Sequence, residues 1–305
     1  MKLSIRKIKP DDTRLAERLV MRTMNSLRET HSMSPVPYKP GRKRNTMMCH
    51  LLKTDPGGTI GAFSGNRLVG YASAMIRDGH WYLAHLFTDQ RFQGKGIGRK
   101  LLKRVYNFNK EAEIHTRSLA TFAFNPFAVQ LYARFGMYPI QLLPMMTWKY
   151  DQKKRVQKIK TDYDLKAVPI DDYDQIEILN SFDLPNRGVC RPEDHKFWID
   201  SELVHGFIYQ YRGNPVGYTW ITRDTVMAPV TSSKPEYLIP CLAETINYMR
   251  GRKFEKLIVW VPGSNGSVLD FLLKNKFKLE ENELLMSDRP FARDDCYLPA
   301  SLAFY

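Results

Sequence analysis

The sequence has no long apolar run. No stretch approaches the ~18–20 consecutive apolar residues that a helix needs to span a bilayer. The first residues, 1–7, lack the apolar segment of a signal peptide. We therefore expect a cytoplasmic protein with no membrane partner.

Cysteine is also scarce. The four cysteines form no C-x-x-C pair and no metal-ligand spacing with histidines; they are Cys49, Cys190, Cys241 and Cys296. Because cytosolic thiols are usually kept reduced, we expect buried free cysteines. His80 and His85 are five residues apart on a predicted strand, so we expect them on opposite faces and unable to share a metal ion.

Acidic residues are outnumbered. The chain has 46 Lys and Arg against 32 Asp and Glu, which gives a net charge of +14 and a pI near 9.5. Such a balance favours anionic partners, such as cofactor phosphates, acidic substrates, nucleic acid or a membrane surface. The densest basic stretches, 39–44 and 153–160, are not interleaved with aromatic residues that could stack on bases. A solvated surface and a basic linker explain them at least as well, and nucleic acid is the less favoured partner.

The length of 305 residues exceeds that of one ordinary domain, so two domains are expected. Hydrophobic residues make up 43% of the chain, which is enough for two packed cores.

A cluster of glycines is the most informative feature. The sequence Gln-Gly-Lys-Gly-Ile-Gly, residues 93–98, lies between a predicted strand at 81–88 and a predicted helix at 99–109. Glycines at a strand-to-helix junction let the backbone approach a bulky ligand closely. Free N–H groups at a helix start attract anions such as pyrophosphate. Residues 93–98 therefore predict a phosphate-binding loop.

Two common phosphate loops are excluded by the spacing. A dinucleotide-binding loop reads G-x-G-x-x-G, but Arg99 stands at its third glycine, and no ribose-binding acid follows in a strand–helix–strand series. The G-x-x-x-x-G-K-[ST] spacing of a P-loop is absent.

The remaining pattern, Q-x-x-G-x-G preceded by Leu86-Phe87-Thr88-Asp89, resembles the acyl-CoA loop of the GNAT superfamily of CoA-dependent N-acetyltransferases. A second match is found at residues 125–137, which resemble the motif N-x-x-A-x-x-L-Y-x-x-x-G-F, except that Met137 replaces the usual aromatic residue. The motifs occur in the family's order with a predicted strand, 119–124, between them. The resemblance covers roughly residues 3–149.

The resemblance implies acetyl-CoA as the cofactor and assigns residues to it. Backbone groups of Leu86, Phe87 and Thr88 would pair with the pantetheine amides, and an N–H near Leu86 would polarise the thioester carbonyl. The pyrophosphate would be held by the backbone of residues that span the glycine loop, namely Gln93, Gly94, Lys95, Gly96, Ile97, Gly98 and Arg99. Asn125 is a further cofactor-binding candidate, and it is equally suited to cap a helix before Pro126.

Tyr132 is the general acid that the resemblance implies. A phenol titrates near ~10 and an alkyl thiol near ~8.5, so the proton transfer between free groups is uphill by little more than a unit. The alternative is an aromatic residue that packs an amphipathic helix onto a sheet.

The general base is less defined. The predicted strand 81–88 contains no glutamate, and His85, His80 and Asp78 are the nearest candidates. His85 would titrate in a useful range, although a lone strand histidine is more often structural. Water alone could also serve.

The predicted fold class is α/β, with a mixed, largely antiparallel twisted sheet flanked by helices. Strands are predicted at 3–8, 59–63, 68–76, 138–141 and 145–150, and a capped helix begins at Asp11-Asp12. Gly65-Asn66 and Asp78-Gly79 are predicted hairpin turns. The segments 30–44 and 297–305 are expected to border the acceptor pocket.

The pattern recurs in the second half, which predicts two tandem copies. Asn265 matches Asn125, but Leu272 then stands in the place of Tyr132. No Q-x-x-G-x-G follows residue 218, and the equivalent stretch contains Pro229, which has no N–H to offer a phosphate. We expect a catalytic domain at 1–150, a basic linker at 151–160 and a degenerate, structural or acceptor-shaping copy at 161–305.

The leading hypothesis is an N-acetyltransferase in which a primary amine attacks acetyl-CoA directly and Tyr132 acts as general acid. One alternative is a non-catalytic module that binds or senses acyl-CoA. Another is an acetyltransferase that acts on a protein or RNA-associated partner, suggested by the charge. Because function resides in the site rather than in the fold, the acceptor amine stays open at this point.

Overall fold

The structure is a computed structural model in which the chain divides into two compact units, Met1–Ser118 and Leu119–Tyr305. It describes residues 3–38, 46–150, 157–202, 204–222, 226–252, 254–300 and 303. The basic stretch at 39–44, the first six residues of the predicted linker (151–156) and most of the tail beyond 300 lie outside the described residues.

Two expectations from composition can be compared with the structure. Among the described residues, no helix is long and apolar enough to cross a bilayer. All four cysteines are free thiols. Cys241 and Cys296 are buried as expected, whereas Cys49, in α2, and Cys190, between α5 and α6, are only half-buried.

The first unit is built on an antiparallel sheet in the order β1-β2-β3-β4. Its strands are β1 (Leu3–Lys7), β2 (Thr59–Ser64), β3 (Arg67–Arg77) and β4 (His80–Thr88). Both predicted turns are confirmed, since Ser64 pairs with Arg67 and Arg77 pairs with His80 across two-residue loops.

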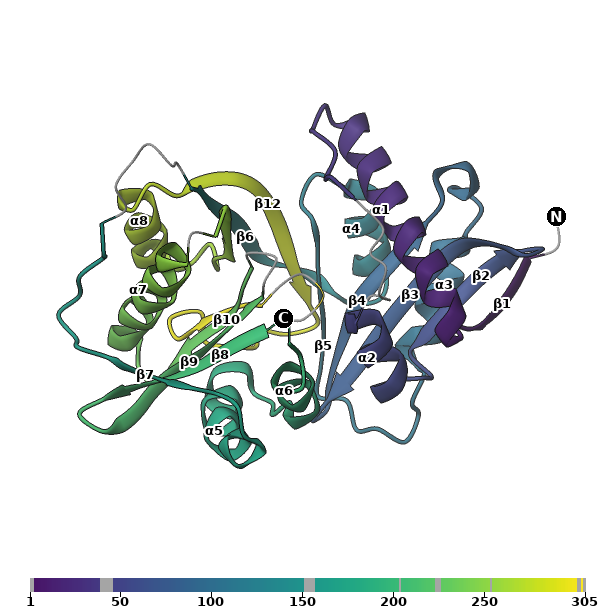
Figure 1. The fold of residues 1–305 in the computed structure, drawn as a ribbon. Coiled ribbons are helices and arrows are strands. Elements are labelled where there is room, and N and C mark those ends of the chain that lie inside the picture. Colours follow the sequence, from purple (N-terminus) through teal and green to yellow (C-terminus); the bar gives the residue numbers. More distant parts are fainter. Residues whose placement is uncertain are drawn as a thin grey trace. The chain divides into compact units, whose positions relative to one another are not determined.

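Helices cover both faces of this sheet (Figure 1). They are η1 (Pro10–Asp12), α1 (Thr13–Thr30), α2 (Thr46–Thr54), η2 (Gln90–Phe92) and α3 (Ile97–Tyr106). Leu19 of α1 and Met48 of α2 pack with Tyr71 on one face. On the other face α3 lies so close that a Cβ on Gly70 would be 2.9 Å from both Ile97 and Leu101. The apolar stripe of each helix is thus buried on the sheet.

The second unit contains two groups of strands, in the orders β5-β12-β6-β11 and β13-β10-β9-β8-β7. A parallel bridge between Val226 and Ile258 connects the second group to β11. The strands are β5 (Thr116–Phe122), β6 (Tyr138–Lys149), β7 (Lys166–Pro169), β8 (Val204–Tyr211), β9 (Asn214–Thr222), β10 (Met227–Ser232), β11 (Lys256–Trp260), β12 (Lys278–Ser287) and β13 (Tyr297–Leu298). The helices are α4 (Pro126–Ala133), η3 (Tyr173–Gln175), α5 (Ile176–Arg187), α6 (Pro192–Ile199), α7 (Pro235–Gly251) and α8 (Gly266–Lys274).

The order of elements repeats along the chain. The series from β1 to β6 runs strand, 3-10 turn, two helices, three strands, helix, strand, helix, strand, with η2 as an addition before α3. The series from β7 to β12 runs through the same types in the same order. The repeat confirms the predicted α/β architecture in two copies.

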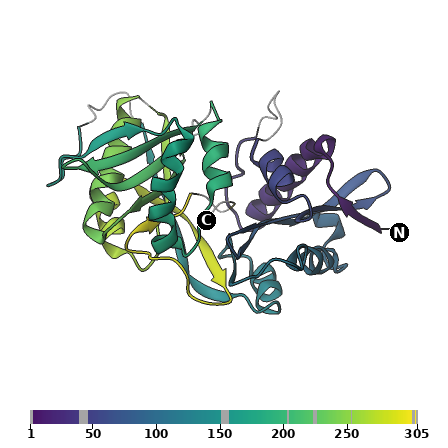
Figure 2. The same ribbon diagram turned by 90° about the horizontal axis from the view of Figure 1, so that it is seen from below.

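The last strands of the two copies are exchanged. β6, from the first series, pairs with β12 on one side and with β11 on the other, both antiparallel (Figure 2, where β12 is yellow and β6 is teal). The prediction of two separate strands at 138–141 and 145–150 was wrong, because β6 is one strand that pairs with β12 along almost its whole length. Pro144 does not interrupt it, since the carbonyl of Pro144 still accepts a hydrogen bond from the N–H of Val261. The domain boundary at 150 stays a prediction, while the compact units divide at 118/119.

Candidate functional site

The glycine loop has the backbone shape that only glycine adopts easily. Gly94 and Gly96 have φ angles of +74° and +73°, in the left-handed region. A Cβ on either residue would meet no atom within 4 Å, so open space lies over the loop. Helix α3 begins at Ile97, two residues before the predicted start, because Gly96 serves as its N-cap. The first N–H groups of α3 therefore have no acceptor within the helix and can bind a ligand.

The charges around the loop favour an anion. Lys95, Arg99 and Lys100 are exposed, and the first turn of α3 contains no acidic residue. Cations at a helix N-terminus oppose the helix dipole, which prefers negative charge there. A bound phosphate would relieve this conflict and would meet backbone N–H groups as well. The loop thus fits the pyrophosphate of acetyl-CoA.

The segment of β4 assigned to the pantetheine is partly accessible. Leu86, Phe87 and Thr88 are half-buried and pair with β3 on one side. The carbonyl of Thr88 accepts a hydrogen bond of 3.2 Å from the side-chain amide of Gln93. Gln93 therefore ties the glycine loop back to the end of β4.

A β-bulge corrects the predicted orientation of the two histidines. Leu83 pairs with Ala74 but His85 pairs with Ser73, so Ala84 is an extra residue in β4. Directly paired residues share a face of the sheet. His80 pairs with Arg77, four residues from Ser73, so His80 and His85 lie on the same face and not on opposite faces. The prediction of opposite faces was wrong because the extra residue of the bulge shifts the alternation of side chains by one position.

His85 and His80 have different surroundings. His85 is 8% exposed, and its Nδ1 has no hydrogen-bond partner among the described residues. Burial lowers the pKa of His85 to about 4, so its imidazole is neutral at physiological pH. His80 is 3% exposed, and its Nε2 lies 2.6 Å from the hydroxyl of Ser118. Of the two histidines, His85 is therefore the better candidate to accept a proton, through its Nδ1.

Tyr132 lies on α4 with its side chain buried. Burial raises the pKa of its phenol above the ordinary value, while a hydrogen bond with Thr121 acts in the opposite direction. Proton donation by Tyr132 is therefore more uphill than a comparison of free groups suggests. Asn125 caps α4, its side-chain oxygen accepting the N–H of Ala128 at 3.3 Å, as its capping alternative predicts.

Asp89 is a residue whose role no sequence pattern indicated. It follows β4 directly, is 3% exposed and forms ion pairs with Arg22 and Arg67. These partners are far away in the sequence, so the pairing is not visible in a local pattern. The one available signal was an acid standing immediately before a glycine loop in a strongly basic segment.

Within residues 226–252, all of which the structure describes, the second copy has no comparable loop. β10 ends at Ser232 and α7 begins at Pro235, so only two residues, 233 and 234, connect them. Pro229 is not in this connection, as the sequence comparison supposed, but lies inside β10 at a bulge between Ala228 and Val230. Leu272, which stands in the place of Tyr132, is fully buried in α8.

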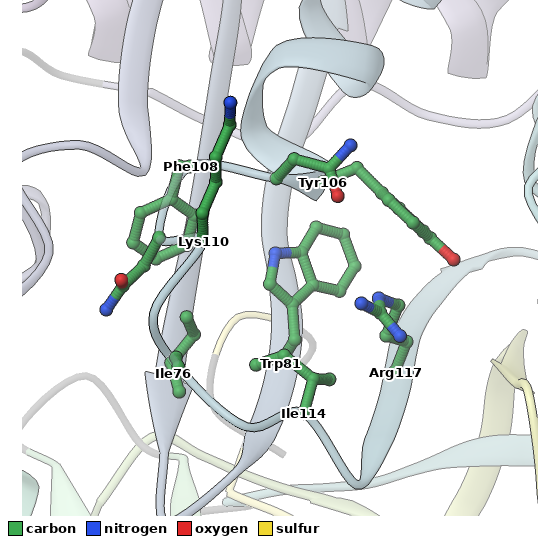
Figure 3. A pocket seen from close by; sticks show the side chains of 10 residues that line it. Ile76, Trp81, Tyr106, Phe108, Lys110, Ile114 and Arg117 are labelled. Carbon is green, nitrogen blue, oxygen red and sulfur yellow. The ribbon is translucent and has the colours of Figure 1, made fainter.

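A cavity of about 300 Å³ lies in the first unit at the other end of α3 (Figure 3). Trp81, Tyr106, Phe108 and Arg117 contribute to its wall, and the Arg117 guanidinium lies 4.5 Å from the Tyr106 ring centre. Ten residues of helix, about 15 Å, separate this cavity from the glycine loop. It is therefore not the candidate phosphate site.

Comparison with known proteins supports the family resemblance. Residues 22–137 match the model of the Acetyltransferase (GNAT) family. The spermine/spermidine N(1)-acetyltransferase of Bacillus subtilis is 33% identical over 97 residues, which are 29% of this chain and 60% of that protein. The chain thus spans about three fifths of the length of this curated relative.

Solved structures match the whole chain at low identity. A candidate acetyltransferase from Pyrococcus horikoshii has a TM-score of 0.72 at 15% identity and covers 99% of this chain and 96% of its own. A tandem GNAT protein from the clavulanic acid biosynthesis pathway has a TM-score of 0.62 at 12% identity, with coverages of 95% and 99%. At these identities the likeness concerns the fold alone. Residues 22–137, which contain both motifs, thus match the Acetyltransferase (GNAT) family, and the chain has the fold of these acetyltransferase structures.

Proposed function

We propose that this protein is an N-acetyltransferase that moves the acetyl group of acetyl-CoA to a primary amine. The observation that carries the proposal is the loop at 93–98, with left-handed Gly94 and Gly96 and open space above them, inside the family-matched segment. Acetyl-CoA supplies the activated thioester. The residues proposed to hold it are those of the loop, Gln93 to Arg99, together with Leu86, Phe87, Thr88 and Asn125.

Tyr132 is the proposed general acid. Its raised pKa keeps the phenol protonated throughout the physiological range, so the proton is present when a leaving group requires it. The hydrogen bond with Thr121 restricts the orientation of the hydroxyl. The acid role and the packing role are compatible, because a buried phenol can do both.

His85 is the first candidate to receive the proton of the amine, and His80 the second. With a pKa of about 4, His85 is a neutral hydrogen-bond acceptor rather than a strong base. We infer that its Nδ1 accepts the N–H of an amine as that amine attacks, when the nitrogen becomes acidic. Asp78, in an exposed turn at the start of β4, stays a weaker candidate.

Small amines are the first acceptors to test, because the relative from Bacillus subtilis is named for spermine and spermidine. A second candidate function is acyl-CoA binding without turnover. It is favoured by the C-terminal copy, which keeps the element order of the fold but lacks both loop and tyrosine.

The test measures CoA release from acetyl-CoA with spermidine and a panel of primary amines. Tyr132→Phe should lower kcat by roughly 10²–10⁴-fold, the usual contribution of a general acid, without changing the Kd of acetyl-CoA. The matched control is Tyr209→Phe, which removes the buried hydroxyl that bonds Thr245 at 2.9 Å in the second copy. Tight acetyl-CoA binding with no CoA release for any amine would favour the binding module, and equal kcat in Tyr132→Phe and wild type would remove the acid role.

A further inference from the structure

Asp89 is the centre of a charged cluster beside the glycine loop. Its carboxylate accepts hydrogen bonds from Nη2 of Arg22 at 2.9 Å and from Nη2 of Arg67 at 2.8 Å. It also accepts the backbone N–H of Arg91 at 3.1 Å and lies 3.4 Å from the guanidinium of Arg91. A carboxylate that is 3% exposed is stable in ionised form only when it is paired and hydrogen-bonded. We call these four residues the Asp89 cluster.

Each arginine of the cluster comes from a different element. Arg22 lies on α1, Arg67 begins β3, and Arg91 is in η2, the turn that leads into the glycine loop. Since Asp89 also caps η2, one carboxylate ties the entry of the loop to a helix and to a hairpin.

The contacts continue into the loop. The ring of Phe92 has Arg67 at 5.8 Å and Lys95 at 5.1 Å from its centre. Nζ of Lys95 donates to the carbonyl of Arg91 at 3.4 Å. The residues between Asp89 and Gly96 are therefore held by the Asp89 cluster together with two side-chain hydrogen bonds, from Ser26 to Gln90 at 2.6 Å and from Gln93 to the carbonyl of Thr88 at 3.2 Å.

The charges explain why the carboxylate matters. Three guanidinium groups surround one carboxylate, which leaves a local charge of +2 (3 − 1), and the arginine side chains remain 51%, 43% and 64% exposed. Without the carboxylate the like charges would repel one another, and η2 would lose its cap. The path of the chain into the glycine loop would then be less defined.

The second copy offers a comparison that links Asp89 to the loop. The N–H of Asp89 donates to the carbonyl of Val69 at 2.9 Å, and the N–H of Ser233 donates to that of Val216 at 2.8 Å. Ser233 is thus the counterpart of Asp89, in the copy where two residues replace the eight, 89–96, that connect β4 to α3. The carboxylate is present where the loop is present and absent where the loop is absent.

We propose that Asp89 is a positioning residue that holds the glycine loop in its phosphate-binding shape before acetyl-CoA arrives. This inference rests on the proposed function, since the loop is taken to bind acetyl-CoA. A loop that is ordered in advance loses less conformational freedom on binding, which lowers the Kd.

The test compares Asp89→Asn with Asp12→Asn by isothermal titration with acetyl-CoA. Asp12 is a matched control in the same unit, because its carboxylate binds Arg6 at 2.6 Å and accepts the N–H of Lys9 at 2.8 Å, away from the loop. Asp89→Asn should raise the Kd and the KM for acetyl-CoA roughly tenfold or more, as expected for lost hydrogen bonds to charged groups, with kcat at saturation little changed. Asp12→Asn should leave the Kd unchanged.

Hydrogen exchange of the protein without acetyl-CoA gives an independent measurement. Peptides covering 90–99 should exchange faster in Asp89→Asn than in wild type or Asp12→Asn. A wild type that fails to bind acetyl-CoA would overturn the proposed function, whereas wild-type affinity and exchange in Asp89→Asn would overturn only the role of Asp89. If Asp89→Asn does not fold, the same measurements are made on Arg22→Gln, with Arg6→Gln as the control. Wild-type affinity and exchange in Arg22→Gln would then overturn the role of Asp89.

Discussion

The two copies share an order of elements but differ where a strand enters a helix. In the first copy eight residues with a 3-10 turn and two left-handed glycines connect β4 to α3. In the second copy two residues connect β10 to α7. Asn125 caps α4 in the first copy, and Asn265 caps α8 in the second copy in the same way. Only the first copy has a tyrosine, Tyr132, in this helix, and the second has Leu272 at the corresponding position. The difference teaches that the order of elements in this fold does not depend on the length of this connection.

Charge separates the two units even more sharply. Residues 1–118 contain 23 Lys and Arg and 9 Asp and Glu, a net charge of +14 (23 − 9). Residues 119–305 contain 23 of each kind, a net charge of 0 (23 − 23). The basic character of the chain is thus confined to the unit that carries the glycine loop, where it can attract an anionic ligand.

The largest expected effect comes from filling the loop of the first copy. Gly96→Val should raise the Kd of acetyl-CoA by roughly a hundredfold. A β-branched side chain at φ +73° costs about 1–2 kcal/mol in backbone strain, and it occupies the space above the loop. Titration with acetyl-CoA measures the effect.

Gly188→Val is the matched control for that change. Gly188 ends α5 in the second copy with a φ of +77° and also has open space around its Cβ position, so the strain is comparable. We expect a lower melting temperature with an unchanged Kd. An equal rise of the Kd in both variants would show that strain, not the position of the loop, weakens binding.

The buried histidines of the two copies allow a second comparison. Burial lowers the pKa of His85 in the first copy and of His195 in the second, but Asp183 lies 3.0 Å from His195 and opposes the shift. Among the residues that the structure describes, no carboxylate opposes the shift of the pKa of His85. Because its folded pKa of about 4 lies below the unfolded value of about 6.5, the unfolded chain binds more protons between these values, and stability falls as the pH falls from 6.5 towards 4.

His85→Gln should remove this contribution of His85 to the pH dependence of the free energy of unfolding. Wild type should lose on the order of 2 kcal/mol more unfolding free energy between pH 7.5 and pH 5 than His85→Gln loses. Urea unfolding at the two pH values gives the measurement. An identical pH dependence in the two proteins would mean that the imidazole is hydrated and titrates normally.

The smallest expected effect concerns the two helix caps. Asn125→Ala and Asn265→Ala should each reduce the free energy of unfolding by about 1 kcal/mol, because each side chain caps one helix in the same way. If Asn125 also binds the cofactor, only Asn125→Ala should raise the Kd of acetyl-CoA. Thermal unfolding and titration of both variants separate capping from binding.

Local features of the fold were predictable from the sequence. The turns at Gly65-Asn66 and Asp78-Gly79, the cap at Asn125 and the glycine loop at a strand-to-helix junction depend on residues that are neighbours in the chain. Such chemistry is read directly from residue types and their spacing.

Long-range features were not predictable. The bulge at Ala84 changes which face His85 occupies, and no local pattern reveals it. The exchange of β6 and β12 depends on pairing between segments more than 100 residues apart. The contacts of Asp89 join residues 22, 67 and 89, which only the folded sheet and helix bring together.

The exchanged strands have a consequence for the order of folding during synthesis. Tyr138 pairs with Ser287, a separation of 149 residues (287 − 138), and Lys149 pairs with Lys256, a separation of 107 (256 − 149). A nascent chain that has emerged only as far as β6 offers two unpaired edges until β11 and β12 have followed. Pairing over such distances is slow, and exposed edges invite aggregation in the meantime. The N-terminal copy can therefore complete its own sheet only after synthesis has reached Ser287, so the C-terminal copy contributes to folding apart from any chemistry.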